Sequence, residues 1–307
     1  MKILIFIIAL ILSLNSECQT AVDYYKRGVA KGKVEDYRGA IIDLNKAIEI
    51  NPKYEIAYFK RGVAKGQLAD YRGAIEDYNK VLEFNPLDDE TYCNRGIAKL
   101  KLEDYRMAII DFSKAIEINP LDASFYYGRG TTKLKLEDYR MAIIDFSKAI
   151  EINPKYQNAY INRGVAKENL TDYRGAIADY NKVIEFNPLD GETYYNRGTV
   201  KYKLEDYRGA ITDFTKAIEI KPLEARFYFY RGIVKGDLED YRGAIADYSN
   251  VIRINSLDAN ALKSIAYYKR GILNYLLKQL DSACLDLSKA GELGSQEAYE
   301  LIKKYCN

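Results

Sequence analysis

The most restrictive feature of this chain is an Arg-Gly pair that recurs at a fixed interval. Seven pairs are spaced 34 residues apart, and an eighth follows after 39 residues. The pairs begin at Arg27, Arg61, Arg95, Arg129, Arg163, Arg197, Arg231 and Arg270. Residues 99–120 and 133–154 even share one sequence, KLKLEDYRMAIIDFSKAIEINP, without a difference. A period of this length indicates an array of small structural repeats, in which each repeat packs mainly on its neighbours.

Each repeat is predicted to fold as two helices. In the third repeat, the first helix is expected from Thr91 to about Leu102 with Asp88 as its N-cap, and Asp104 is placed to cap the second helix. The second helix is expected to end before Pro120, because a residue that precedes proline is disfavoured in the α-helical conformation. The predicted organisation is a signal peptide at 1–18, repeats at 21–54, 55–88, 89–122, 123–156, 157–190, 191–224 and 225–258, a divergent eighth repeat at 259–292 and a C-terminal capping helix at 293–307.

These repeats resemble the tetratricopeptide repeat (TPR). That family places an aromatic residue at position 4, small residues at positions 8, 20 and 27, an aromatic residue or leucine at position 24 and proline at position 32. The third repeat matches with Tyr92, Gly96, Ala108, Phe112, Ala115 and Pro120. The resemblance implies an all-α fold, a right-handed superhelical α-solenoid of stacked helix–turn–helix repeats whose first helices line a concave groove. Similarity to exported bacterial repeat proteins also favours a bacterial source.

Comparison of the eight repeats separates constant positions from variable ones. Position 4 is always tyrosine, position 7 is always arginine and position 23 is always aspartate. Lysine at position 11 and aspartate at position 16 occur in seven repeats, and the eighth replaces both, by Asn274 and Gln279. The pattern predicts two polar pairs in each repeat, arginine 7 with aspartate 23 and lysine 11 with aspartate 16. It also predicts that the glycine at position 8 approaches the alanine at position 20, as Gly28 would approach Ala40.

The variable positions predict where a partner binds. In the family that these repeats resemble, positions 2, 5, 6, 9, 12 and 13 tend to face the groove, and an asparagine at position 6 binds the backbone of an extended ligand in several members. Here position 5 is mostly aromatic and position 6 is asparagine in three repeats, although Gly128 interrupts the series. A carboxamide offers both a donor and an acceptor to a peptide. The candidate partner-binding residues are Tyr25, Phe59, Asn94, Tyr127, Asn162, Tyr195, Asn196 and Phe229. The alternative is that the aromatic residues pack on neighbouring helices and that the asparagines are merely solvated.

Composition argues against catalysis. The chain has no histidine, which removes the usual general base near neutral pH and the commonest zinc ligand. No nucleophile–base pair, metal cluster or phosphate-binding glycine loop stands out, so no catalytic, metal-binding or cofactor-binding residue is predicted. The basic positions suggest a nucleic-acid face at first sight, but each has a matching acidic position, so we expect no nucleic-acid partner.

Two functions remain open from the sequence. The first is a non-enzymatic scaffold that binds another protein or an extended peptide in its concave groove. The second is an architectural or assembly factor of the cell envelope that acts through its convex face or its ends. Near-identical repeats favour the second, because a recent duplication changes length more than specificity.

The first residues predict export. Lys2 precedes an apolar run at residues 3–14 that is too short to span a bilayer, and the small residues Ser16 and Cys18 fit a signal-peptidase site. Cleavage after Cys18 would release a periplasmic or extracellular protein of the cell envelope with no membrane span. An alternative is a lipid anchor on Cys18, which Glu17 disfavours because a small residue normally precedes a lipidated cysteine.

Three further cysteines are Cys93, Cys284 and Cys306. An exported protein can keep a disulfide, and Cys284 and Cys306 are near enough to one end to pair. The preferred interpretation is that all three are small apolar packing residues.

Overall fold

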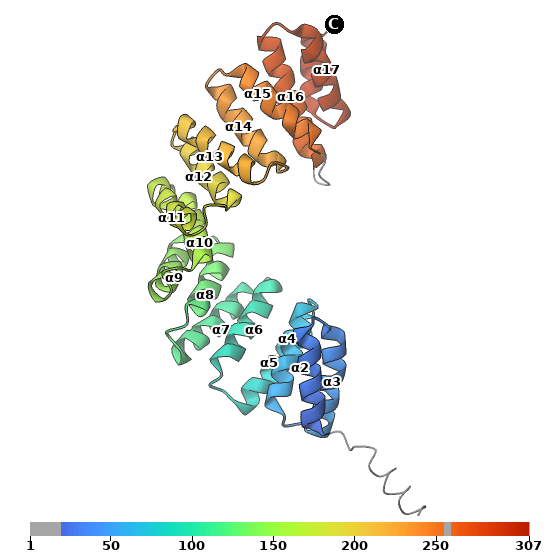
Figure 1. Ribbon diagram of the computed structural model, residues 1–307, viewed down its shortest axis with the longest axis vertical. Coiled ribbons are helices and arrows are strands. Elements are labelled where there is room, and N and C mark those ends of the chain that lie inside the picture. The colour runs from blue at the N-terminus through green and yellow to red at the C-terminus, as the bar shows by residue number, and fades with distance from the viewer. Residues whose placement is uncertain (1–19, 255–258, 307) are drawn as a thin grey trace, which may run out of the picture. The chain divides into compact units, whose positions relative to one another are not determined.

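The described part of the chain consists of helices and short connections between them. The computed structural model describes residues 20–254 and 259–306, so the predicted signal peptide lies outside the described residues. Within these ranges there is no strand, and the helices pack as consecutive helix–turn–helix pairs (Figure 1). The predicted all-α repeat solenoid is therefore confirmed.

The chain divides after Pro154 into two compact units, the N-terminal unit and the C-terminal unit. The N-terminal unit, blue to green in Figure 1, contains α2 (Ala21–Lys33), α3 (Tyr37–Ile50), α4 (Glu55–Gln67), α5 (Tyr71–Phe84), α6 (Asp89–Lys101), α7 (Tyr105–Ile118), α8 (Ala123–Lys135) and α9 (Tyr139–Ile152). The C-terminal unit contains α10 (Gln157–Asn169), α11 (Tyr173–Phe186), α12 (Gly191–Lys203), α13 (Tyr207–Ile220), α14 (Ala225–Asp237), α15 (Tyr241–Arg253), α16 (Ala259–Leu276), α17 (Leu280–Glu292) and α18 (Gln296–Tyr305). Across the segments that the structure describes, no helix has the length and apolarity that a bilayer crossing needs.

Local signals in the sequence set the ends of these helices. Asp88 accepts a hydrogen bond from the N–H of Thr91 at 3.0 Å, and Asp104 accepts one from the N–H of Met107 at 3.4 Å. These caps satisfy backbone donors that have no partner inside the helix. The turn between the two helices contains Glu103 at a φ of 60°, a left-handed conformation that reverses the chain within a few residues.

Within each unit, a second helix packs on its own first helix and on the first helix of the next repeat. First helices also contact one another, as α2 does with α4, α4 with α6 and α6 with α8 in the N-terminal unit. They therefore lie side by side, and their variable positions 2, 5, 6, 9, 12 and 13 form what we call the groove face. The core lies between the two layers of helices, where Ala108, Phe112 and Ala115 are fully buried.

A glycine at position 8 lets the two helices of one repeat approach closely. A Cβ at Gly62 would lie 2.7 Å from Cε1 of Tyr78, which is position 24 of the same repeat. A Cβ at Gly28 would lie 2.9 Å from Cγ of Leu44 and 3.2 Å from the carbonyl oxygen of Ala40. The close approach to position 20 is thus confirmed, but the side chain at position 24 is the nearer neighbour.

The C-terminal unit ends differently from the repeats before it. Helix α16 has 18 residues, against 13 in α14, and α18 packs on α17. Ala298 of α18 is fully buried in one apolar cluster with Leu287 and Ala290 of α17. Cys284 and Cys306 form a disulfide that ties the end of α18 to α17. The interpretation of these two cysteines as unpaired packing residues is therefore wrong.

Candidate binding groove

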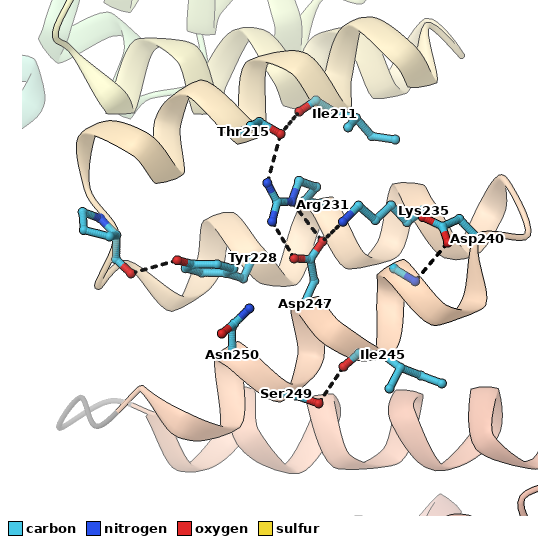
Figure 2. Close-up of polar contacts among 12 residues, drawn as sticks. Ile211, Thr215, Tyr228, Arg231, Lys235, Asp240, Ile245, Asp247, Ser249 and Asn250 are labelled. Carbon is cyan, nitrogen blue, oxygen red and sulfur yellow. Dashed lines mark hydrogen bonds and ion pairs between the residues drawn. The ribbon is translucent and has the colours of Figure 1, made fainter.

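An arginine at position 7 joins neighbouring repeats. Figure 2 shows Arg231, whose Nε and Nη2 donate to the two carboxylate oxygens of Asp247 at 2.9 and 2.7 Å. Its Nη1 donates to Oγ1 of Thr215, at position 25 of the preceding repeat, at 3.0 Å. The ring of Tyr228, at position 4, lies 5.7 Å from the guanidinium carbon, within the range of a cation–π contact.

This contact recurs along the chain. All eight repeats have the two-bond contact between arginine 7 and aspartate 23. The bond to position 25 of the preceding repeat occurs in the six repeats that have a predecessor in the same unit. The predicted arginine–aspartate pair is confirmed, and it belongs to a larger contact that holds two repeats together.

The lysine at position 11 binds the same aspartate, so the predicted pair with aspartate 16 is wrong. Nζ of Lys235 lies 2.8 Å from Oδ2 of Asp247. Asp240, at position 16, instead caps α15 by accepting a hydrogen bond from the N–H of Gly243 at 2.9 Å. Seven repeats have an aspartate at position 16 and another at position 23, and the lysine pairs with the buried one at position 23.

The eighth repeat shows why the two positions change together. Asn274 replaces the lysine and donates to Oδ2 of Asp286 at 3.0 Å, so the bond is kept without the charge. Gln279 replaces the capping aspartate, and its side chain makes no cap hydrogen bond to α17. The changes to Asn274 and Gln279 therefore affect two separate contacts. Because both occur in the same divergent repeat, they gave the false indication that positions 11 and 16 form a pair.

In the first repeat, the buried aspartate at position 23 is stabilised in its charged form. The hydrogen bonds from Arg27 lower the pKa of the Asp43 carboxyl to about 2, although its burial opposes the shift. Because the pKa is lowered in the folded chain, this carboxylate stabilises the fold at pH values above about 4. That stabilisation is lost as the pH falls toward 2.

The structure places the position-5 aromatic residues against second helices. Phe59 and Phe229 are only 7% and 8% exposed. Their ring centroids, and those of Tyr127 and Tyr195, lie 5.8–6.0 Å from the ring at position 24 of the same repeat. Tyr25, Tyr127 and Tyr195 are half-buried. All five therefore have a packing role, and their contact with a partner stays a prediction.

The three candidate asparagines lie on the groove face and are half-buried. Nδ2 of Asn94 donates to the carbonyl oxygen of Glu90 in its own helix at 2.9 Å, and Asn94 also lines a cavity between α4 and α6. Asn162 and Asn196 occupy the same repeat position in α10 and α12. Their binding to a peptide backbone stays a prediction as well.

Gly128 interrupts the asparagine series because an aromatic ring takes the space of a side chain. A Cβ on Gly128 would lie 2.7 Å from Cζ of Phe112, which belongs to the preceding repeat, and closer still to Cε1. Position 5 of the third repeat is Cys93, a small buried residue in the same apolar cluster as Phe112. Burial raises the pKa of the Cys93 thiol to about 12, so this cysteine is a packing residue and not a nucleophile at neutral pH.

Replacing Gly128 with asparagine is expected to destabilise the fourth repeat by about 1–3 kcal/mol, because the added side chain displaces the Phe112 ring. Urea unfolding followed by helical circular dichroism measures the loss. The matched control is Gly66→Ala, since a Cβ on Gly66 would meet no atom within 4 Å. Equal urea midpoints for Gly128→Asn and the wild type would show that the ring is not what excludes a side chain here.

Three cavities open on the groove face, each between two successive repeats. The first notch, of about 220 Å³, lies between α2, α3 and α4, and the second, of about 340 Å³, lies between α4, α5 and α6. The third notch, of about 270 Å³, lies between α14, α15 and α16. Each contains the glycine at position 12 of the earlier repeat, namely Gly32, Gly66 or Gly236.

Packing does not explain these three glycines. A Cβ on any of them would meet no atom within 4 Å, and none has a positive φ. The other repeats carry a larger residue at position 12: Leu100, Leu134, Glu168, Tyr202 and Tyr275. Tyr202 spans the corresponding place in its own unit, since its hydroxyl donates to Asp237 of the next repeat at 2.7 Å. A large side chain at position 12, such as Tyr202, can thus occupy the place of a notch between two repeats, although a cavity of about 230 Å³ lies beside Tyr275 between α16, α17 and α18.

Charge differs between the groove faces of the two units. In the N-terminal unit, the charged groove positions are Lys26, Lys33, Lys60, Glu90, Lys101 and Lys135. In the C-terminal unit they are Glu168, Glu192, Lys203, Arg226, Asp237 and Lys269. There, Lys203 pairs with Glu168 at 2.9 Å and Arg226 pairs with Glu192 at 2.5 Å. The first face has an excess of lysine, whereas the second is balanced and largely paired within itself.

The repeats match a known family. Models of the tetratricopeptide repeat match residues 24–54, 56–86 and 157–188 in one case and residues 90–121, 123–156 and 191–222 in another. Together these segments cover more than half of the chain, and they indicate no enzymatic family. No curated protein matches the chain.

Solved structures of similar proteins superpose on parts of the chain. YrrB, described as a TPR protein with an unusual peptide-binding site, is 26% identical with a TM-score of 0.51, over 58% of this chain and 92% of YrrB. MamA is 26% identical with a TM-score of 0.52, over 56% of this chain and 94% of MamA. The C-terminal part of a TPR repeat-containing protein from Cytophaga hutchinsonii gives a TM-score of 0.69 at 18% identity, over 79% and 98% of the two chains, a likeness of fold alone.

Proposed function

The chain belongs to the tetratricopeptide repeat family, and from that premise we propose that it is a non-enzymatic scaffold that holds an extended peptide segment of another protein on its groove face. The observation that carries this proposal is the contrast between positions. The arginine–aspartate–lysine contacts hardly change from repeat to repeat, whereas the residues that line the notches differ. Because constant contacts hold the repeats together, the residues on the groove face can vary to suit one partner without altering the fold.

The chemistry of the face supports a peptide ligand. The first notch is lined mostly by apolar side chains, whereas Asn94 and Gln67 give the second notch amide donors and acceptors beside apolar residues such as Ile97. The resemblance to YrrB, a protein with a peptide-binding site, points the same way. We assign the direct contacts to positions 6, 9, 12 and 13, and to the accessible edges of Tyr25, Tyr127 and Tyr195 at position 5.

We also propose that the protein acts in the cell envelope, outside the cytoplasm. The apolar N-terminal run predicts export, and the pair Cys284–Cys306 suits an oxidising compartment.

A second candidate function is architectural, and exposed leucines favour it. At position 33, just after the proline that follows a second helix, the leucines are 73–80% exposed: Leu87, Leu121, Leu189 and Leu223. Leucines this accessible at one repeat position could dock on another component of the envelope.

Pull-down from an envelope extract separates the two functions. The groove variant changes Asn94, Ile97 and Lys101 to alanine, and the edge variant changes Leu87 and Leu121 to alanine. Phe59 and Phe229 are left intact, because truncating a buried aromatic residue costs about 3–5 kcal/mol and would disturb the fold. We expect the groove variant to lose the main partner and the edge variant to keep it, with unchanged helicity in both. Loss with the edge variant alone would favour the architectural function instead.

A further inference from the structure

We propose that the N-terminal unit binds an acidic peptide segment, and that apolar side chains of this segment enter the first and second notches. The proposal deepens the proposed function and rests on it. It names the part of the groove face that binds and the chemistry that the ligand must have.

The two notches are suited to single side chains. Their volumes of about 220 and 340 Å³ exceed the roughly 150 Å³ of a protein cavity that admits benzene. Leu44 and Val29 line the first, Tyr78 and Ile97 line the second, and Val63 lines both. A shared wall residue means that the notches follow one another along the face, so one extended segment could fill both.

The charge around the notches selects an acidic segment. The first notch is lined by Lys33 and Lys60, the second by Lys101, and neither lining contains a carboxylate. Lys26 and Lys135 extend the positive charge along the groove face. None of these five lysines forms an ion pair with another residue in the described ranges 20–254 and 259–306. Like charges around a recess attract a ligand of the opposite sign from a distance and leave it paired after binding.

The third notch is the natural comparison. It also contains a glycine at position 12, but Asp237 and Lys269 both line it, and the groove positions of its unit carry as many acidic as basic residues. We therefore expect acidic ligands to prefer the N-terminal unit.

A peptide fits this surface better than a nucleic acid. Single-stranded nucleic acids bind through bases that stack on accessible aromatic rings. In the N-terminal unit, Phe59 is 7% exposed, and Tyr25 and Tyr127 are half-buried, so that they offer the edges of their rings and not a free face for stacking. Around the notches, the face offers lysines beside apolar side chains such as Val63 and Ile97, which match carboxylates and aliphatic side chains.

The test is a selection from a displayed library of short random peptides on the full-length protein, followed by fluorescence anisotropy with an enriched peptide. The test variant is Gly32→Leu with Gly66→Leu, which installs the residue that the third and fourth repeats carry at position 12. Gly236→Leu in the third notch is the matched control. All three changes replace glycine by a better helix former with free space around it, so the melting temperature should stay equal or rise.

We expect enriched peptides to be acidic and to carry a leucine, isoleucine or phenylalanine. Filling each notch should weaken the binding of such a peptide about ten- to hundredfold, the equivalent of one buried apolar side chain, and Gly236→Leu should leave it unchanged. Lys33→Gln with Lys60→Gln should weaken it too, by a factor that shrinks as salt is added.

Four results would overturn the inference. Enrichment of neutral or basic peptides would refute the acidic ligand and leave the proposed function standing. Equal affinity after both notches are filled would refute the notches as the site. Tight binding of a single-stranded oligonucleotide, with the same affinity for the wild type and for the filled variant, would show that the lysines serve a nucleic acid. If no peptide is enriched on any form of the protein, peptide binding by the groove face fails as well.

Discussion

Replacing Asp145 with asparagine should lower the free energy of unfolding around the fourth repeat by about 3–5 kcal/mol, the cost of removing one partner from a buried ion pair. Asp145 is 2% exposed and accepts hydrogen bonds from Nε and Nη2 of Arg129 at 3.0 and 2.8 Å. Nζ of Lys133 lies 2.7 Å from its Oδ2. An asparagine would leave two cations, 21% and 11% exposed, around a neutral amide.

The effect should spread to the third repeat. Nη1 of Arg129 donates to Ser113 at 3.1 Å, so an arginine that loses its carboxylate also loosens its hold on the preceding second helix. Hydrogen exchange should show faster exchange in α8 and α9 first and then in α7, and helicity should be lost at lower urea concentrations.

The matched control is Glu151→Gln in the same second helix. Glu151 pairs with Lys148 at 2.7 Å, but both side chains are well exposed, at 68% and 41%. An exposed pair of this kind contributes about 1 kcal/mol or less. Should both variants unfold at the same urea concentration, the buried position of Asp145 has no special weight and our account of the arginine–aspartate contact is wrong.

Features encoded locally were accessible from the sequence. The aspartate caps such as Asp104 and the prolines after second helices each act within a few residues, and the 34-residue period shows that the same helix pair recurs along the chain. The pair between Arg129 and Asp145 was accessible for a different reason. Both positions are constant in all eight repeats, and a buried guanidinium requires a carboxylate partner.

Several other contacts between residues that only the tertiary structure brings together could not be predicted from the sequence. An aspartate at position 16 serves equally well as a cap or as an ion-pair partner, and only the structure shows that Lys235 reaches past it to Asp247. The clash at Gly128 needs the position of Phe112 in another repeat. Gly32 and Gly66 line the notches. A glycine does not indicate a cavity in the sequence, because the walls of the cavity come from neighbouring helices.

The near-zero net charge of the whole chain does not indicate the excess of lysine on the groove face of the N-terminal unit. The formal net charge is +2, and basic and acidic residues nearly cancel. The cancellation is uneven, because the buried aspartates are neutralised by the arginines and lysines of the scaffold, such as Arg95 and Lys99 around Asp111. Lysines such as Lys33 and Lys60 lie outside that scaffold network, and their charge remains available to a ligand.

Replacing Cys306 with serine should destabilise α18 by about 3 kcal/mol, because the disulfide to Cys284 closes a loop with a sequence separation of 22. Helix α18 is only 10 residues long, too short to be stable alone, so it depends on the disulfide and on the burial of Ala298. Hydrogen exchange in α18 should rise strongly in the variant, while exchange in α10 to α13 stays as in the wild type.

The loss of α18 would uncover the last apolar surface of the array. Leu287 and Ala290 of α17 are buried together with Ala298, and a terminal repeat without such a cover exposes the surface that neighbouring repeats otherwise bury. We therefore expect the Cys306→Ser variant to self-associate at high concentration, as sedimentation velocity would measure. A reductant should produce the same change in the wild type and none in the variant. If the reduced wild type keeps slow exchange in α18, apolar packing alone holds the cap and the disulfide is dispensable.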